Sequence, residues 1–469
     1  MKFTHSTLFK VFNALDPEEL KALQKAIQSP FFNYRLEEIR LFDFLLLAKK
    51  TNRTDYAVED VCSAIFPKQK PDTAKLRHVM TYLLRIIYRC LNISEFEKDE
   101  TLNRLLLSRT LRRKKLNKQF LAEYNETLAY YNGAALIDSA LYYHRLLLNT
   151  EHYAYTITDR RPENANLKQL SDDLDSFFVI QKLKQACNIL SYKNIFKNDY
   201  QPELLPEVLE LVKRNKLLSN PLINLLYYSY QTLAEPDDEN HFMALKKTLL
   251  HDSGKIETNE LKDVFTLAIN YCIKRLNTGN YSYYQQVFDV YKAGLEKDVF
   301  TDEGKFSPFT YKNIASIALG LKEFDWALGF IDKYRLHLDD NLRDGFYAYC
   351  LARYFFIKHD YNRVTDLLQE VEIKDVFTEI DSRVLLIKAY YEMDEYNLMG
   401  YAIENLKQLI KRRKMQTYHE QVYTNFVRMV KKLLSIKQYD KTGKQLFLKK
   451  LDSITAMAEK DWIRSKISV

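Results

Sequence analysis

Apolar side chains recur at intervals of three and four residues along most of the chain, which is the period of one face of an α-helix. The first long helix has a well-marked start, because Asp16 is a typical N-cap residue and Pro17 suits the first helical position. The pair Ser29-Pro30 is expected to end it. Further helices are predicted over 36–50, over 58–66 and from the N-cap Asp72 onward.

Beyond residue 98, long amphipathic segments alternate with short polar turns, and a repeat emerges in the second half. Its marker is an aromatic residue at each turn, where one helix ends and its partner begins. These aromatics are Tyr281, Phe324, Tyr361 and Tyr396, which are separated by 43, 37 and 35 residues. One helical hairpin cannot bury both of its apolar faces, so successive hairpins are expected to stack and share a continuous core.

These repeats resemble the tetratricopeptide superfamily, in which a helix, a tight turn with an aromatic and an antiparallel second helix form a unit of about 34 residues. The best match is 311–334, where Ala315 and Ala327 stand at the positions of small residues. The neighbouring repeats carry larger residues in place of Ala327, so the repeat is degenerate. The resemblance is clear over about 260–410 and only suggestive over 110–260.

The resemblance and the periodicity together predict an all-α fold, an α-solenoid of antiparallel helix pairs with a small N-terminal helical module. Scarce helix breakers agree with this, because the 469 residues include 10 Gly and 10 Pro, well below the average of roughly 7% and 5%. Four segments are expected: an N-terminal module over 1–98, divergent hairpins over 99–260, tetratricopeptide-like repeats over 261–440 and a C-terminal capping helix over 441–469.

No motif in the sequence indicates catalysis, a cofactor or a metal. The ten glycines are isolated, so there is no phosphate-binding loop, and the nine histidines lack zinc spacing. Acidic pairs such as Asp237-Asp238 occur where helices begin, and capping accounts for them. We therefore expect a protein that is not an enzyme. The cysteines are far apart among apolar residues and are expected to be buried thiols: Cys62, Cys90, Cys187, Cys272 and Cys350.

The expected location is the cytoplasm. No stretch approaches the roughly 18 uncharged apolar residues that cross a bilayer, so no membrane span is predicted. The first residues lack the apolar region and the cleavage site of a signal peptide. A reducing compartment also fits the unpaired cysteines.

The resemblance implies a binding surface as well. In tetratricopeptide arrays the first helix of each repeat lines a concave groove, so six residues are expected to face it: Lys312, Ser316, Tyr349, Arg353, Lys388 and Tyr391. Cations interleaved with tyrosines suit an extended acidic peptide or a C-terminal carboxylate. The predicted function is a non-enzymatic protein–protein interaction scaffold that binds another protein or peptide. The plainer interpretation, that the tyrosines only pack between helices, stays open.

Charge supports an alternative. There are 70 Lys and Arg against 62 Asp and Glu, a mild net charge of +8, and basic residues cluster over 109–118 and 411–414. Phosphate contact needs several cations on one surface. A nucleic-acid-binding or transcription-regulatory protein that uses basic helix faces near 72–118 is therefore the alternative. Basic residues are also common at helix C-termini, where the dipole favours them. A structural module of a larger assembly is a third possibility, and the sequence carries no signal for oligomeric state.

Overall fold

A computed structural model describes residues 3–51, 56–67, 69–157, 166–196, 200, 202–214, 217–413, 417–436 and 440–467. Its regular elements are helices, apart from the hairpin of β1 (Thr301–Asp302) and β2 (Lys305–Phe306) and an isolated bridge between Ile137 and Ile256. The helices pack mainly against their neighbours in sequence. The predicted all-α, solenoid-like fold class is therefore confirmed.

The described chain forms two compact units. One comprises Met1–Ala135 with Ser139–Phe178, and the other comprises Leu136–Asp138 with Val179–Val469. The boundary between Phe178 and Val179 falls within helix α9 (Leu167–Phe196). The finer division into four segments stays a prediction.

The first unit begins with a helical module around one apolar core. Its start signals act as expected, because Asp16 Oδ1 accepts a hydrogen bond from the Glu19 amide at 2.8 Å and Glu19 Oε2 accepts one from the Asp16 amide at 2.8 Å. Asp72 likewise caps the last helix of the module. The elements are η1 (Phe3–His5), α1 (Thr7–Ala14), α2 (Pro17–Gln28), α3 (Leu36–Thr51), α4 (Val58–Ile65) and α5 (Thr73–Lys98).

A second core follows in the same unit, built by α6 (Glu100–Arg113), α7 (Asn117–Asn132) and α8 (Ser139–Thr156) around Phe120 and Leu148. A buried polar chain ties these helices to the start of α9. Tyr124 donates to Asn149 at 2.8 Å, Asn149 donates to Asp173 at 2.6 Å, and Arg145 donates to the same carboxylate at 2.7 Å. These buried polar side chains of the second core therefore satisfy one another, as burial of polar groups requires.

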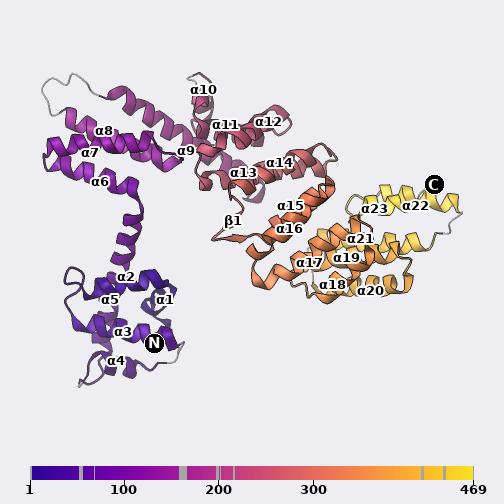
Figure 1. Ribbon diagram of the computed structural model, residues 1–469, viewed down its shortest axis with the longest axis horizontal. Coiled ribbons are helices and arrows are strands. Elements are labelled where there is room, and N and C mark those ends of the chain that lie inside the picture. Colours follow the sequence, from indigo (N-terminus) through magenta and orange to yellow (C-terminus); the bar gives the residue numbers. More distant parts are fainter. Residues whose placement is uncertain are drawn as a thin grey trace. The chain divides into compact units, whose positions relative to one another are not determined.

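The second unit is a succession of helix pairs. Figure 1 shows those from α13 to α20 as antiparallel neighbours. The helices are α10 (Leu205–Arg214), α11 (Pro221–Ala234), α12 (Glu239–Lys247), α13 (Thr258–Asn277), α14 (Tyr283–Glu296), α15 (Pro308–Gly320), α16 (Phe324–Tyr334), α17 (Asp340–Ile357), α18 (Tyr361–Glu370), α19 (Val376–Glu392), α20 (Tyr396–Arg413), α21 (Thr417–Leu434), α22 (Lys441–Asp452) and α23 (Lys460–Ser465). Short helical turns are η2 (Leu217–Ser219), η3 (Thr248–Asp252), η4 (Ser253–Lys255) and η5 (Arg335–His337).

The turns within the four repeats share one backbone geometry. The residue two places before each turn aromatic has a positive φ: 92° at Gly279, 64° at Lys322, 61° at His359 and 59° at Asp394. In every case the next amide donates to the carbonyl five residues earlier, at 2.9 to 3.1 Å. This left-handed C-cap with a six-to-one hydrogen bond is the Schellman motif. Its recurrence is compatible with the helical-repeat fold expected from the sequence.

Gly279 allows a test of this turn. A Cβ added there would meet nothing within 4 Å, so only the backbone conformation opposes a side chain. We expect Gly279→Ala to lower the free energy of unfolding by about 1–2 kcal/mol. Gly329, within α16, has equally open surroundings but no positive φ. Gly329→Ala should therefore raise the free energy of unfolding by about 0.5–1 kcal/mol. Urea denaturation followed by circular dichroism measures both, and equal effects would contradict the assignment of strain to the turn.

Candidate binding site on the C-terminal repeats

Three consecutive first helices position the residues expected to bind a partner. Lys312 and Ser316 lie on α15, Tyr349 and Arg353 on α17, and Lys388 and Tyr391 on α19. Residues three or four apart share one face of a helix. Helix α17 packs against both α15 and α19, so these faces lie side by side. We call these six residues the cation wall.

Four of the six residues form one connected group. Lys312 Nζ lies 5.6 Å from the centroid of the Tyr349 ring. Arg353 donates a hydrogen bond to Ser316 Oγ, and that hydroxyl donates to the Lys312 carbonyl at 2.6 Å. Tyr349 is buried and Arg353 is half-buried. The structure therefore brings the α15 and α17 residues together inside the array.

Two further residues complete this group. The carboxylate of Asp381, on α19, accepts a hydrogen bond from Lys312 at 3.1 Å and another from the Tyr423 hydroxyl of α21 at 2.8 Å. Neither Asp381 nor Tyr423 was indicated by the sequence pattern. The sequence does contain a signal for Asp381. It precedes Lys388 by seven residues, or two helical turns, so the two residues share one face of the helix.

Lys388 is paired with a carboxylate from a distant segment. Its Nζ donates to Glu459 Oε2 at 2.7 Å and lies 4.6 Å from the centroid of the Phe356 ring. Lys388 is buried, whereas the Glu459 side chain keeps 41% of its surface exposed. Burial lowers the pKa of Lys388, and the charge of Glu459 offsets this only in part. For Glu459, burial acts to raise the pKa, but the charges of Lys388 and Arg353 lower it overall.

Trp462 covers the Tyr391 end of the cation wall. Its ring meets the Tyr391 ring edge-on at 5.4 Å between centroids, and its Nε1 donates to Glu392 at 2.8 Å. Lys466 Nζ approaches the same carboxylate at 2.5 Å. Residues 453–467, which we call the C-terminal segment, therefore lie against α19.

Hydrogen bonds hold the loop that presents Glu459. The residue itself has a left-handed backbone, with a φ of 52°, directly before α23. Asn425 of α21 donates to the Ala456 carbonyl at 2.9 Å, and Lys460 donates to the Ile454 carbonyl at 2.7 Å. Helix α23 packs on α21 and α22, as Figure 1 shows at the C-terminal end of the array. The carboxylate is thus delivered by a defined turn.

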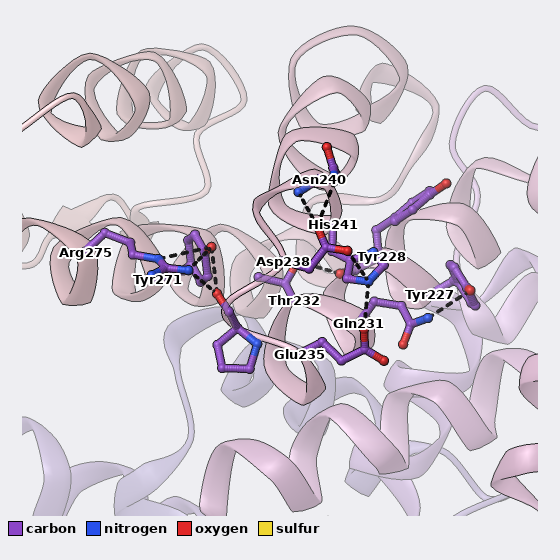
Figure 2. Close-up of polar contacts among 11 residues, drawn as sticks. Tyr227, Tyr228, Gln231, Thr232, Glu235, Asp238, Asn240, His241, Tyr271 and Arg275 are labelled. Carbon is purple, nitrogen blue, oxygen red and sulfur yellow. Dashed lines mark hydrogen bonds and ion pairs between the residues drawn. The ribbon is translucent and has the colours of Figure 1, made fainter. Parts of the chain in front are cut away.

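A separate polar cluster lies at the turn between α11 and α12 (Figure 2). His241 Nε2 is 3.3 Å from Glu235 Oε2 and 3.5 Å from Asp238 Oδ2, and these three residues offer ligand atoms within 4.8 Å of one another. Such groups can hold a metal ion. Asp238 also accepts from the Asn240 amide at 3.0 Å, so its expected capping role is confirmed. Capping and pairing of the histidine with carboxylates already account for this surface arrangement.

The same turn is anchored from α13. Figure 2 shows Tyr271 and Arg275 reaching it from the neighbouring helix. The Tyr271 hydroxyl donates to the Pro236 carbonyl at 3.0 Å, and Arg275 donates to it at 2.5 Å. The turn therefore belongs to the packing of consecutive helix pairs.

The cysteines behave as the sequence indicated for most positions. All five are free; Cys90 is half-buried and the other four are buried. Burial raises the pKa of Cys187, Cys272 and Cys350 to about 12. A thiol with so high a pKa holds almost no thiolate at neutral pH, and the thiolate is the reactive form.

Two arginines of the predicted basic face form ion pairs within the chain. Arg109 and Arg112 approach the two oxygens of Glu151 at 2.7 and 2.6 Å. Burial acts to raise the pKa of Glu151, yet hydrogen bonds from the two arginines lower it overall. Arg113, Lys114 and the residues that follow, up to Gln119, are exposed.

Comparison of the chain with protein-family models, curated proteins and solved structures finds no match. Among the described residues, no helix combines the length and the apolar character needed to cross a membrane.

The Glu459–Lys388 pair predicts a pH-dependent stability. Because the pKa of Glu459 is lowered from 4.5, its contribution is present above that value and is lost as the pH falls through the folded-state pKa. Glu459→Gln should therefore lower stability at pH 7 by about 1–2 kcal/mol. This lies between surface pairs, at about 0–1 kcal/mol, and broken buried pairs, at about 3–5 kcal/mol, since the carboxylate is partly exposed.

Urea titration followed by Trp462 fluorescence, with Trp326 replaced by Phe in both proteins, measures this difference. The difference in free energy of unfolding between parent and variant should shrink below pH 4.5, the ordinary pKa of a glutamate carboxyl. Glu395→Gln, at an exposed position of the α19–α20 turn, is the matched control. A gap that stays constant from pH 7 to pH 3 would contradict the assignment.

Proposed function

We propose that this chain is a non-enzymatic, tetratricopeptide-like interaction scaffold of the cytoplasm, which binds an acidic segment of another protein on the cation wall. The observation that supports this is the C-terminal segment itself. It brings a carboxylate, Glu459, to Lys388 and an aromatic ring, Trp462, to Tyr391. The chain thus supplies an internal example of the chemistry that Lys312, Arg353, Lys388 and the tyrosines are suited to bind.

The pair is asymmetric in a way that suits exchange. Lys388 is held by packing against Phe356 and is buried, whereas the Glu459 side chain is 41% exposed. A buried cation without a partner is strongly unfavourable. An incoming carboxylate must therefore replace Glu459 rather than leave Lys388 unpaired. In this proposal the C-terminal segment competes with the partner for the cation wall.

A peptide with the sequence of residues 454–464 tests the proposal. Glu459→Gln with Trp462→Ala in the full chain removes the two internal contacts and should free the wall. This released variant should bind the fluorescein-labelled peptide, as measured by fluorescence anisotropy, while the parent chain binds it far more weakly. The same peptide carrying Glu459→Gln should bind at least about tenfold more weakly, because hydrogen bonds to charged groups contribute about 1.5–3 kcal/mol.

Lys388→Met in the released variant provides a second control, since it removes the charge and keeps a long side chain. It should abolish the difference between the two peptides. Equal binding of both peptides to the released variant that retains Lys388 would refute recognition of a carboxylate. Failure of a folded released variant to bind either peptide would refute the wall as a binding surface.

The alternative function, nucleic-acid binding near 72–118, is favoured by a different observation. Lys114, Lys115 and Lys118 are exposed together with Arg113, and a left-handed turn at Lys115 joins α6 to α7. Binding through this basic turn should weaken steeply with salt, by a slope of about −0.9 per phosphate neutralised on duplex DNA. Gel-shift titrations of parent and Lys114→Gln/Lys115→Gln measure that slope. Absence of binding at low salt, or an unchanged slope in the variant, would contradict this alternative.

A further inference from the structure

The N-terminal module contains a buried carboxylate that the fold leaves without a hydrogen bond. The Glu38 side chain, on α3, is 1% exposed, and neither of its oxygens has a partner. The nearest guanidinium nitrogen, Arg35 Nη1, is 3.9 Å from Glu38 Oε1. Burial raises the pKa of Glu38. A carboxylate held in this way is costly to the fold, so a ligand that satisfies it would recover free energy.

Glu38 lines a small open cavity between the turn before α3 and helix α5. The cavity measures about 220 Å³ and is also lined by Asn33, Tyr34, Tyr82, Ile86 and three arginines. Pockets for drug-sized ligands begin at about 300 Å³. The space therefore suits one flat ring system whose charged substituent stays at the mouth.

The three arginines are held on aromatic rings. The Arg35 guanidinium lies 4.3 Å from the Tyr82 centroid, and that of Arg85 lies 5.6 Å from the same centroid. The Arg89 guanidinium lies 4.6 Å from the centroid of Phe31. Within the described residues, the only ion-pair approach of these arginines to a carboxylate is that of Arg35 to Glu38. Most of their charge remains for a ligand.

The turn that carries the aromatics is fixed before any ligand binds. The Asn33 side chain donates to the Ile27 carbonyl at 3.1 Å and to the Arg35 carbonyl at 2.8 Å, and it accepts from the Arg35 amide at 3.0 Å. Phe31 and Tyr34 on this turn are nevertheless 72% and 84% exposed. Arg89 also donates a hydrogen bond to the Phe31 carbonyl at 3.3 Å. Exposed aromatic rings beside arginines are typical of surfaces that stack bases.

The charges of Glu38 and the three arginines determine which ligand fits the cavity. A simple cation would be repelled by three arginines, and a simple anion would meet Glu38. The ligand must offer N–H donors to the interior and negative charge to the mouth. Guanine presents two parallel donors, N1–H and N2–H, on its Watson–Crick edge, and these match the two oxygens of one carboxylate. Its phosphate matches the arginine forks.

We propose that this cavity binds a guanine nucleotide, with the base against Glu38 and the phosphate at Arg85 and Arg89. The site is separate from the cation wall and does not depend on the function proposed for it. The nucleotide is either free or part of a single-stranded RNA, in which case Phe31 and Tyr34 stack the neighbouring bases.

Isothermal titration calorimetry on the full chain tests the proposal. GMP should bind more tightly than AMP, CMP or UMP. A single-stranded RNA hexamer with one guanine should bind more tightly than GMP if RNA is the source, and no more tightly if the free nucleotide is. The proposal would be overturned if neither GMP nor the hexamer bound. Equal binding of all four mononucleotides would overturn it as well.

Variants locate the site. Glu38→Gln should weaken GMP binding by about 5- to 150-fold and abolish the base preference, because one bidentate contact to a base is lost. Its thermal midpoint should be unchanged or higher, since a buried charge without a hydrogen bond is removed. Glu37→Gln, the neighbouring residue on α3 with the same change in charge, should leave binding unchanged.

Arg89→Gln should weaken binding of every nucleotide alike, and Arg77→Gln, at another exposed position on α5, should not. These variants keep the test decisive if Glu38→Gln fails to fold. Retention of parental GMP affinity and base preference by folded Glu38→Gln would refute the role of the carboxylate, and unaltered binding by Arg89→Gln would refute that of the arginine.

Discussion

Every helix pair of this chain has an apolar face that its own hairpin cannot cover, and the next pair must cover it. The tight turns make this possible. In each turn one residue with a left-handed backbone ends the first helix, and the chain then reverses direction. A backbone hydrogen bond spans the turn. Three of the four left-handed positions hold Lys322, His359 and Asp394 rather than glycine. The strain of roughly 1–2 kcal/mol at each is offset by the burial that the turn permits.

The same requirement explains why the C-terminal segment lies where it does. A helix with an uncovered apolar face needs a neighbour to cover it, and α22 and α23 pack on α21. An entirely apolar segment would cover the apolar faces but leave Lys388 without a carboxylate within the array. Glu459 and Trp462 supply a carboxylate and a ring at that point. One segment therefore both packs on α21 and pairs Lys388, so the fold and the proposed binding site compete for the same residues.

Local signals made the helices and the repeat predictable, whereas pairings between distant residues were not. Asp16 and Asp72 act within a few residues of themselves, and the turn aromatics mark hairpins that close locally. The turn at Lys115 was missed although its geometry is the same, because Asn117 stands where the other turns have an aromatic. The membership of the cation wall followed from the repeat register. Its partner Glu459 did not, because 71 residues separate it from Lys388 and one sequence carries no record of such a contact.

Two carboxylates of this chain show how differently a fold treats buried charge. Glu459 has its cation and keeps contact with water, so it contributes to the stability of the array and requires no ligand to explain it. Glu38 is buried without a hydrogen bond, although Arg85 and Arg89 stand at the same cavity and Gln would fill the same volume without a charge. Stability alone gives no reason to keep a carboxylate there, because a buried charge without hydrogen bonds opposes folding. A bound group with two N–H donors supplies that reason, and it places chemical selectivity in the small N-terminal module rather than in the repeats.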